Sequence, residues 1–160
     1  MESSKKKDYE SKLLEMGIKI SDAPKPRGAY LPALQVGNLL YTSGQGPLEN
    51  GQWAYLGQVG KDLTTDEGYR AARICVINCL AAVKSIIGNL NSIDRIISLR
   101  GFVNSAPGFF NQPSVLNGAS EFLIDVFGES GKHVRSAIGT SILPFNIPVE
   151  VELLVKIKPI

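Results

Sequence analysis

The segment 64–87 constrains the fold more than any other part of this sequence. Its apolar residues recur at steps of three and four, which places them on one stripe of a helix: Tyr69, Ala72, Val76, Cys79, Leu80, Val83 and Ile87. Thr64 followed by Glu67 fits a capping box, and Gly88 fits the end of the helix. A helix with a single apolar stripe has to cover another apolar surface, which the rest of the chain must supply.

Two further helices are expected. The residues that follow Pro113 repeat the helical spacing and end at Gly128 and Gly131, with a stripe of Leu116, Ala119, Phe122, Leu123, Val126 and Phe127. A short leading helix over 8–16 is predicted by Tyr9, Leu13 and Met16 at helical spacing. The prolines of segment 21–28 predict an extended connection after it, so that 1–25 forms a helix and a connecting segment.

The remaining patterns are those of β-strands. The segment 148–157 alternates strictly, with Val149, Val151, Leu153 and Val155 on one face. The dipeptide Asn50-Gly51 is suited to a two-residue hairpin turn. The other expected strands are 31–35, 38–43, 53–59, 95–103 and 134–142. The order of elements predicts one α+β domain over 1–160, a mixed sheet with two long helices packed on one face.

Composition narrows the function classes. The chain has 160 residues and a net charge of only +2, from 17 Lys plus Arg against 15 Asp plus Glu, so it lacks the basic footprint of a dedicated nucleic-acid binder. Its apolar runs fall short of the roughly 18 residues that a membrane span needs. The basic start of the chain runs into Asp8 without an apolar stretch, so it is not a signal peptide. We expect a cytoplasmic protein without membrane partners.

The sequence predicts neither a metal site nor a cofactor. Cys75 and Cys79 stand four residues apart within the first long helix, where buried helix positions are expected rather than a disulfide or a zinc pair. His133 is the only histidine and is read as a loop residue. No phosphate loop, dinucleotide glycine fingerprint or nucleophile elbow is present.

Several polar residues suit a small site for an acid, although each also fits a solvated face, a strand end or core filling. Arg135 near the start of a strand suits a bidentate grip on a carboxylate. Glu150 and Glu152 lie on the alternate face of the last strand and either meet solvent or line a site. The other candidates are Tyr30, Asn117 and the strand end Ser43-Gly44, where a glycine lets a ligand approach the backbone.

These residues occur in an order that resembles the RidA family, also called the YjgF or L-PSP endoribonuclease family. The resemblance covers 26–156 and suggests the longer-chain branch of the family, with its N-terminal helix. Its motifs are Gly28-Ala29-Tyr30, the stretch from Val36-Gly37-Asn38 to Ser43-Gly44-Gln45, Phe102-Val103, Asn117, Arg135-Ser136, Pro144 and Val149-Glu150-Val151-Glu152. Two departures stand out: Ala137 occupies a position where many members have Cys, and 106–112 lengthens a loop.

The resemblance implies a chorismate-mutase-like fold, a homotrimer with clefts between subunits, and cofactor-free hydrolysis of reactive enamines or imines, such as 2-aminoacrylate, to 2-keto acids and ammonia. In that setting Arg135 would hold the substrate carboxylate, with backbone N–H groups at Gly44 and Ala137, and Glu150 would activate water. Tyr30, Ser43 and Asn117 would bind substrate, with Tyr30 donated across the subunit boundary.

Two other functions remain open at this point. A non-catalytic, regulatory trimer that binds small carboxylates would use the same arginine without turnover. Endoribonuclease activity, which the older family name implies, is disfavoured because the charge balance offers no footprint for RNA.

Overall fold

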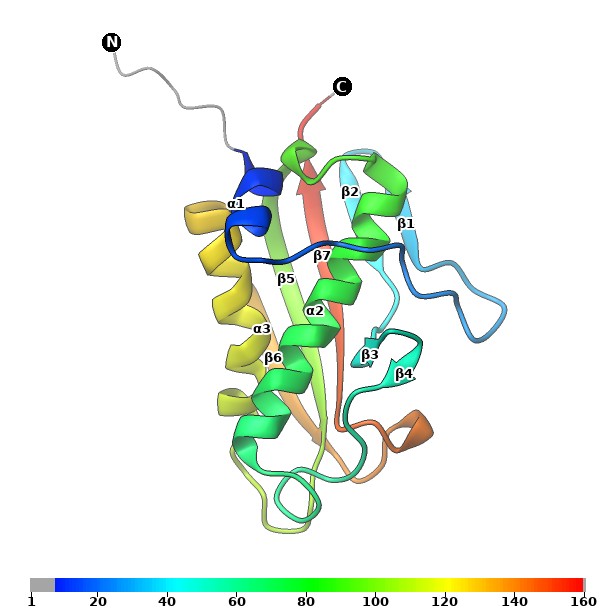
Figure 1. Cartoon of the computed structure of the whole chain (residues 1–160), viewed down its shortest axis with the longest axis vertical. Helices are drawn as coiled ribbons and strands as arrows, with labels where there is room; N and C mark the ends of the chain where they lie inside the picture. The colour runs from blue at the N-terminus through cyan, green and yellow to red at the C-terminus, as the bar shows by residue number, and fades with distance from the viewer. Residues whose placement is uncertain (1–7, 160) are drawn as a thin grey trace.

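The structure, a computed structural model, describes residues 8–159 and contains a five-stranded sheet with two long helices on one face (Figure 1). The sheet order is β1 (Ala33–Val36), β2 (Leu39–Thr42), β7 (Val149–Ile157), β5 (Ile93–Asn104) and β6 (Val134–Thr140). Only β5 and β6 are parallel, and helix α3 (Gln112–Phe127) provides the crossover that such a pair requires. The predicted α+β class with a mixed sheet is confirmed.

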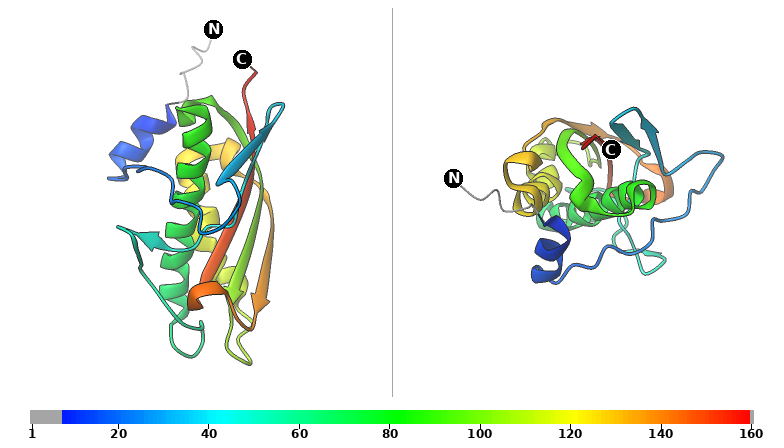
Figure 2. Two further views of the ribbon diagram at one scale, coloured as in Figure 1. Left: turned by 90° about the vertical axis from the view of Figure 1, so that its right-hand side faces the viewer. Right: turned by 90° about the horizontal axis from the view of Figure 1, so that it is seen from above.

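Helix α2 (Thr65–Ile87) has the caps that its sequence predicts. The Thr64 hydroxyl accepts from the Glu67 N–H at 3.1 Å, and the Glu67 carboxylate accepts from the Thr64 N–H at 2.8 Å. Gly88 closes the helix with a φ of 75°. Helix α2 lies against the sheet, beside α3 (Figure 2). The middle of its stripe, from Ala72 to Val83, is buried there, whereas Tyr69 and Ile87 at the two ends are partly buried.

The two cysteines lie in this buried layer as free thiols. Cys75 and Cys79 donate to the carbonyl oxygens of Val149 and Val151, at 3.3 and 3.2 Å. Burial raises the pKa of Cys79 to about 12. Both thiols therefore pack as small helix residues, as predicted, and join α2 to the central strand β7.

Helix α1 (Tyr9–Glu15) packs across the ends of the long helices. The Tyr9 ring meets the edge of Phe127 with ring centroids 4.6 Å apart. The Glu10 carboxylate pairs with Lys84 at 2.9 Å and accepts from the Leu90 N–H at 2.9 Å, where the short 3₁₀ helix η1 (Leu90–Ser92) begins. The predicted leading helix is thus confirmed. The expectation for 1–25 also covers residues 1–7, which lie outside the described residues.

The strand predicted over 53–59 is wrong for most of its length. Asn50 and Gly51 do form a turn with φ of 52° and 78°, but the hairpin it joins consists only of β3 (Leu48–Glu49) and β4 (Gln52–Trp53). Gly57 follows with a φ of 112°, which interrupts extended pairing. The remaining strands differ from prediction only at their ends, and two further 3₁₀ turns, η2 (Gly128–Gly131) and η3 (Pro144–Asn146), precede β6 and β7.

The sheet has one covered and one open face, and strand register decides which side chains occupy each. One cross-strand row, Leu153, Leu99 and Arg135, points toward the helices. Another row, Glu150, Phe102 and Ile138, points the other way. The open face also carries exposed apolar side chains: Leu34, Val36, Tyr41, Val134 and Ile138.

Candidate active site

Arg135 stands on the edge strand β6, with its side chain under helix α3. Its Nη1 donates to Asn117 Oδ1 at 2.9 Å and to Ser120 Oγ at 3.1 Å, and its Nη2 donates to the carbonyl of Pro113 at 3.3 Å. The structure thus brings together Arg135 and Asn117, two residues that the sequence separates by the rest of α3 and the turn η2. We call Arg135, Asn117 and the neighbouring Ala137 the arginine half-site.

A chain of hydrogen bonds supports this arginine from behind. The carbonyl of Gly131 can only accept, so the 2.6 Å contact assigns a proton to His133 Nδ1 and leaves Nε2 as an acceptor for the Ser120 hydroxyl, 2.9 Å away. Burial and the adjacent Arg135 charge lower the pKa of His133, which favours this neutral form. His133, which the sequence indicated only as a loop residue, therefore helps to orient Arg135 through Ser120.

Glu150 lines a different feature, a cavity of about 150 Å³. Burial, and secondarily the charge of Glu152, raise the pKa of the Glu150 carboxyl. A carboxyl group with a raised pKa is suited to exchanging a proton with water near neutral pH. Gly44 lies directly against it, because a Cβ built at Gly44 would come within 2.8 Å of Glu150 Cδ. The glycine predicted at the strand end therefore makes room for this carboxylate.

Tyr30 borders the same cavity, and its hydroxyl oxygen accepts from the Arg27 N–H at 3.3 Å. Ser43 is turned elsewhere, since its hydroxyl donates to the carbonyl of Leu31 at 2.6 Å. Together with Tyr30, Ser43 lines a shallower neighbouring hollow. We call Glu150, Gly44 and Tyr30 the glutamate half-site.

The two half-sites do not meet within one chain. Arg135 is level with Leu99 on the covered face, while Glu150 is level with Phe102 on the open face. Three residues of rise and two strand spacings separate their backbones by roughly 14 Å. A single chain therefore presents the Arg135 guanidinium on one face of the sheet and the Glu150 carboxyl on the other.

Three further residues, which no sequence pattern marked as site residues, border the cavity beside the glutamate half-site. Arg27 lies with its guanidinium carbon 4.9 Å from the ring centroid of Trp53 and 5.3 Å from that of Phe145. All three residues line the cavity. The only local signal was the position of Arg27 directly before the Gly28-Ala29-Tyr30 motif, because Trp53 and Phe145 reach this place only through the fold.

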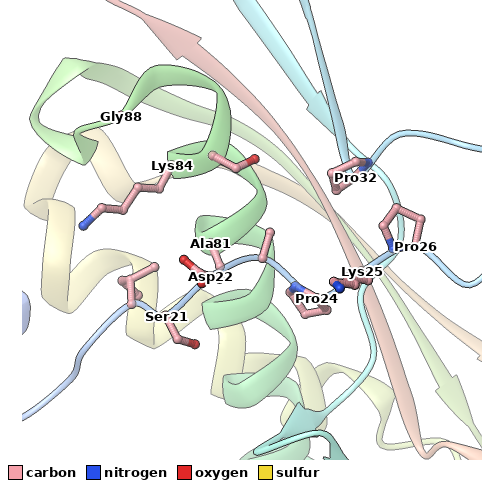
Figure 3. A pocket seen from close by; sticks show the side chains of 12 residues that line it. Ser21, Asp22, Pro24, Lys25, Pro26, Pro32, Ala81, Lys84 and Gly88 are labelled. Atoms are coloured by element: carbon pink, nitrogen blue, oxygen red, sulfur yellow. The ribbon is translucent and has the colours of Figure 1, made fainter.

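A larger cavity of about 450 Å³ lies between the segment that follows α1 and the C-terminal half of α2 (Figure 3). It is lined largely by prolines and small residues, with Asp22, Lys25 and Lys84 as its charged members, and it contains none of the predicted site residues. Lys84 extends away from Pro24 and Lys25 in this view, toward its ion pair with Glu10. This cavity thus offers no converging reactive groups.

Within residues 8–159, no helix is both long and apolar enough to cross a bilayer. Nor do the described residues include three histidine, cysteine, aspartate or glutamate side chains grouped to hold a metal ion.

Comparison with known proteins places this architecture in a family. Residues 10–157 match the family model described as "YjgF/chorismate mutase-like, putative endoribonuclease". The chain therefore belongs to the YjgF/chorismate mutase-like family, and the resemblance seen in the sequence is confirmed, as is the fold that it implied.

Individual relatives agree with this assignment. The chain is 39% identical to Protein TCP17 of Trypanosoma cruzi over 147 residues, which cover 91% of this chain and 92% of that protein. The crystal structure of Atu1372 from Agrobacterium tumefaciens, a protein of unknown function, superposes with a TM-score of 0.88 at 44% identity, covering 94% of this chain and 92% of the other. A protein from Shewanella oneidensis MR-1 named a putative endoribonuclease has a TM-score of 0.91 at 35% identity, covering 94% and 99%.

Proposed function

We propose that this protein hydrolyses 2-imino acids, and the enamines in equilibrium with them, to 2-keto acids and ammonia, in clefts that two copies of the chain complete. The observation that carries the proposal is the division of the machinery into the arginine half-site and the glutamate half-site, which lie on opposite faces of one sheet. A head-to-tail contact that sets one half against the other unites them, and repeated contacts of this kind form a ring when the rotation between copies closes.

The open face of the sheet supports such an assembly. Leu34, Val36, Tyr41, Val134 and Ile138 are between 44% and 69% exposed there, more apolar surface than a solvated sheet face needs. Val134 and Ile138 come from the same edge strand as Arg135. Burial of this face against a second copy brings the β6 edge of one chain toward another, and the family resemblance supports a ring of three copies.

The chemistry requires few groups. Asn117 and Ser120 hold the Arg135 guanidinium in orientation by accepting hydrogen bonds from it. The guanidinium N–H groups that these two residues do not use hold the substrate carboxylate. Glu150 removes a proton from water as the water oxygen bonds to the imine carbon, and the same carboxyl gives this proton to the imine nitrogen, so that a carbinolamine forms. Glu150 then carries the proton of the carbinolamine hydroxyl to the amino nitrogen, the carbon–nitrogen bond breaks as the carbonyl forms, and ammonia and the 2-keto acid leave. Water and the imine supply every atom of the products.

The raised pKa of Glu150 supports both roles, because a carboxyl that binds its proton more tightly is a better base toward water and still a competent acid toward nitrogen. Gly44 supports the positioning of the group, since no side chain competes with the carboxylate for that space.

Complementation between two inactive variants tests both the reaction and the shared cleft. Arg135→Ala and Glu150→Gln should each fail to release keto acid from 2-aminoacrylate generated in situ. For Glu150→Gln, kcat should fall by about 10²- to 10⁴-fold. When the two are unfolded and refolded together in equal amounts, about one quarter of the clefts should contain both intact halves, so activity should return. Arg70→Ala, which breaks only an exposed ion pair with Asp66, is the control.

The outcomes separate the candidate functions. Unchanged turnover by Arg135→Ala rejects the deaminase, and two inactive variants that never complement reject the shared cleft. A wild-type protein that binds a 2-keto acid through Arg135 without turning over any imine is the non-catalytic carboxylate-binding protein. Cleavage of RNA that survives further purification and weakens with salt would instead support the ribonuclease that the family description names.

A further inference from the structure

Arg27 is held in place by aromatic rings rather than by a carboxylate. Trp53 and Phe145 stack with their centroids 5.6 Å apart and their planes inclined by 28°, and the guanidinium of Arg27 lies about equally far from both. An arginine bound through cation–π contact keeps its N–H donors available at the edges of the planar group. The three residues come from the 24–30 segment, from β4 and from η3, so only the folded chain assembles them.

The backbone under this stack is strained. Phe145 has φ of 60° and ψ of 13°, and Asn146 follows with φ of 58°. A bulky residue in the left-handed region is an outlier that persists only where the surrounding structure holds it, and such residues gather at ligand sites. The Gly57 N–H secures the loop by donating to the carbonyl of Asn146 at 2.7 Å. The loop carries the Phe145 ring into the lining of the cavity that Glu150 also borders.

The charges around the cavity leave an anion site open. Its charged lining residues are Lys25, Arg27 and Glu150. Among residues 8–159 the ion pairs involve other groups, so neither Lys25 nor Arg27 has an acidic partner within 4.0 Å. Two cations therefore face one carboxyl, and that carboxyl is the group whose pKa burial raises.

The position of the cavity indicates which part of a substrate would enter it. If Arg135 of a second copy holds the α-carboxylate and the imine carbon lies at Glu150, the carbons beyond the imine are the part left to occupy this cavity. An anion at their end would meet Arg27 on its aromatic support. A wholly apolar side chain would leave the guanidinium without a partner.

We propose that Arg27, supported by Trp53 and Phe145, is a second anion subsite that selects imino acids with an acidic side chain, the four- and five-carbon dicarboxylic imino acids. This inference rests on the proposed function for the identity of the substrate. The binding site itself stands on the geometry of the cavity alone. Arg27 is thus a specificity-determining residue at one end of the cleft, while Arg135 binds the α-carboxylate at the other.

The test compares two imino acids of equal length. An amino-acid oxidase generates 2-iminoglutarate from glutamate and 2-iminopentanoate from norvaline. Wild-type protein should prefer the dicarboxylic substrate in kcat/KM, and Arg27→Met, which keeps length and packing but removes charge, should lower that value by about 10- to 100-fold. Turnover of 2-iminopentanoate should fall by a much smaller factor, because this substrate places no charge at Arg27, so the ratio of the two kcat/KM values is the readout. Arg70→Met, at an exposed position on α2, is the matched control.

Binding measurements separate this inference from the proposed function. Calorimetric titration with the stable acids 2-oxoglutarate and 2-oxobutanoate needs no turnover. Arg27-dependent preference for 2-oxoglutarate supports the subsite even when no imine is hydrolysed. An equal preference in wild-type and Arg27→Met overturns the inference. Where Arg27→Met loses the preference, Arg27→Lys, which retains a charge at this position, should keep part of it and so shows that misfolding is not the cause of the loss. A change in assembly mass on Arg27→Met also overturns it, because the arginine then pairs with a neighbouring chain.

Discussion

Gly44→Ala is the sharpest test of the glutamate half-site. Gly44 is not among the residues with a positive φ, so alanine fits its backbone without strain. The new Cβ would lie 2.8 Å from Glu150 Cδ and 3.0 Å from its Cγ. Because carbon atoms pack at about 3.5–4.0 Å, the carboxyl group must move by about 1 Å. One methyl group therefore displaces the proposed base without altering its chemistry.

The expected effect is large on turnover and small on folding. A displacement of about 1 Å can lower the rate of a positioned reaction by about 10²-fold. Forcing Glu150 off its rotamer costs about 0.5–1.5 kcal/mol, and the Gly→Ala change returns about 0.4–1 kcal/mol through the unfolded chain. The net change in the free energy of unfolding is then within about 1 kcal/mol, or about 2–4 °C in Tm.

Steady-state kinetics of imine hydrolysis and thermal unfolding measure these two quantities. The control is Gly44→Ala in a Glu150→Ala background, where the clash is gone and the second change should cost no stability. Full turnover by Gly44→Ala would refute the reasoning, because the carboxyl position would then not matter. A loss of more than about 3 kcal/mol would also refute it, since an overlap that only a flexible side chain relieves should cost less.

Two further predictions concern stability. Burial raises the pKa of Glu150 in the folded protein. The contribution of this carboxyl to the free energy of unfolding is therefore fully present below its unfolded pKa of about 4.3, and it is lost as pH rises through the folded pKa. Glu150→Gln should therefore raise Tm at pH 7.5 and lose this advantage near pH 4; an equal gain from the exposed Glu49→Gln would contradict it. Gly118→Ala should destabilise by about 1–3 kcal/mol or more, because its Cβ would lie 2.8 Å from the carbonyl carbon of Tyr69 and would separate α2 from α3. A Tm equal to that of the α3 surface variant Asp125→Ala would contradict this close approach.

The sequence predicted elements whose signals are local. The capping box of α2 and the Asn50-Gly51 turn depend on residues only a few positions apart, and both formed as expected. The strand predicted over 53–59 failed because Gly57 adopts a positive φ and because Val59 makes only isolated bridges, with Leu63 and Ser105, rather than joining the sheet. Strand propensity does not include the competition for backbone partners that decides such a segment.

The candidate site shows a similar division. Arg135, Asn117 and Glu150 were recognised in the sequence because their order resembles that of a family. The sequence did not predict on which face of the sheet these residues lie, because a shift of one residue in the register of β6 or β7 would move either charged side chain to the other face. Nor could the sequence bring Arg27 to Trp53 and Phe145, which lie far apart along the chain.

By itself the sequence determined the α+β class, the family and the residue types available for acid binding. Periodicity, caps and motifs each depend on residues that lie close together in the sequence, so they can be recognised without the structure. Tertiary structure decided that Arg135 and Glu150 face away from each other, that His133 supports the arginine, and that Arg27 stands over two stacked rings. These outcomes depend on strand register and on loops that meet only after folding, and neither is set by the interactions of a residue with its neighbours in the chain.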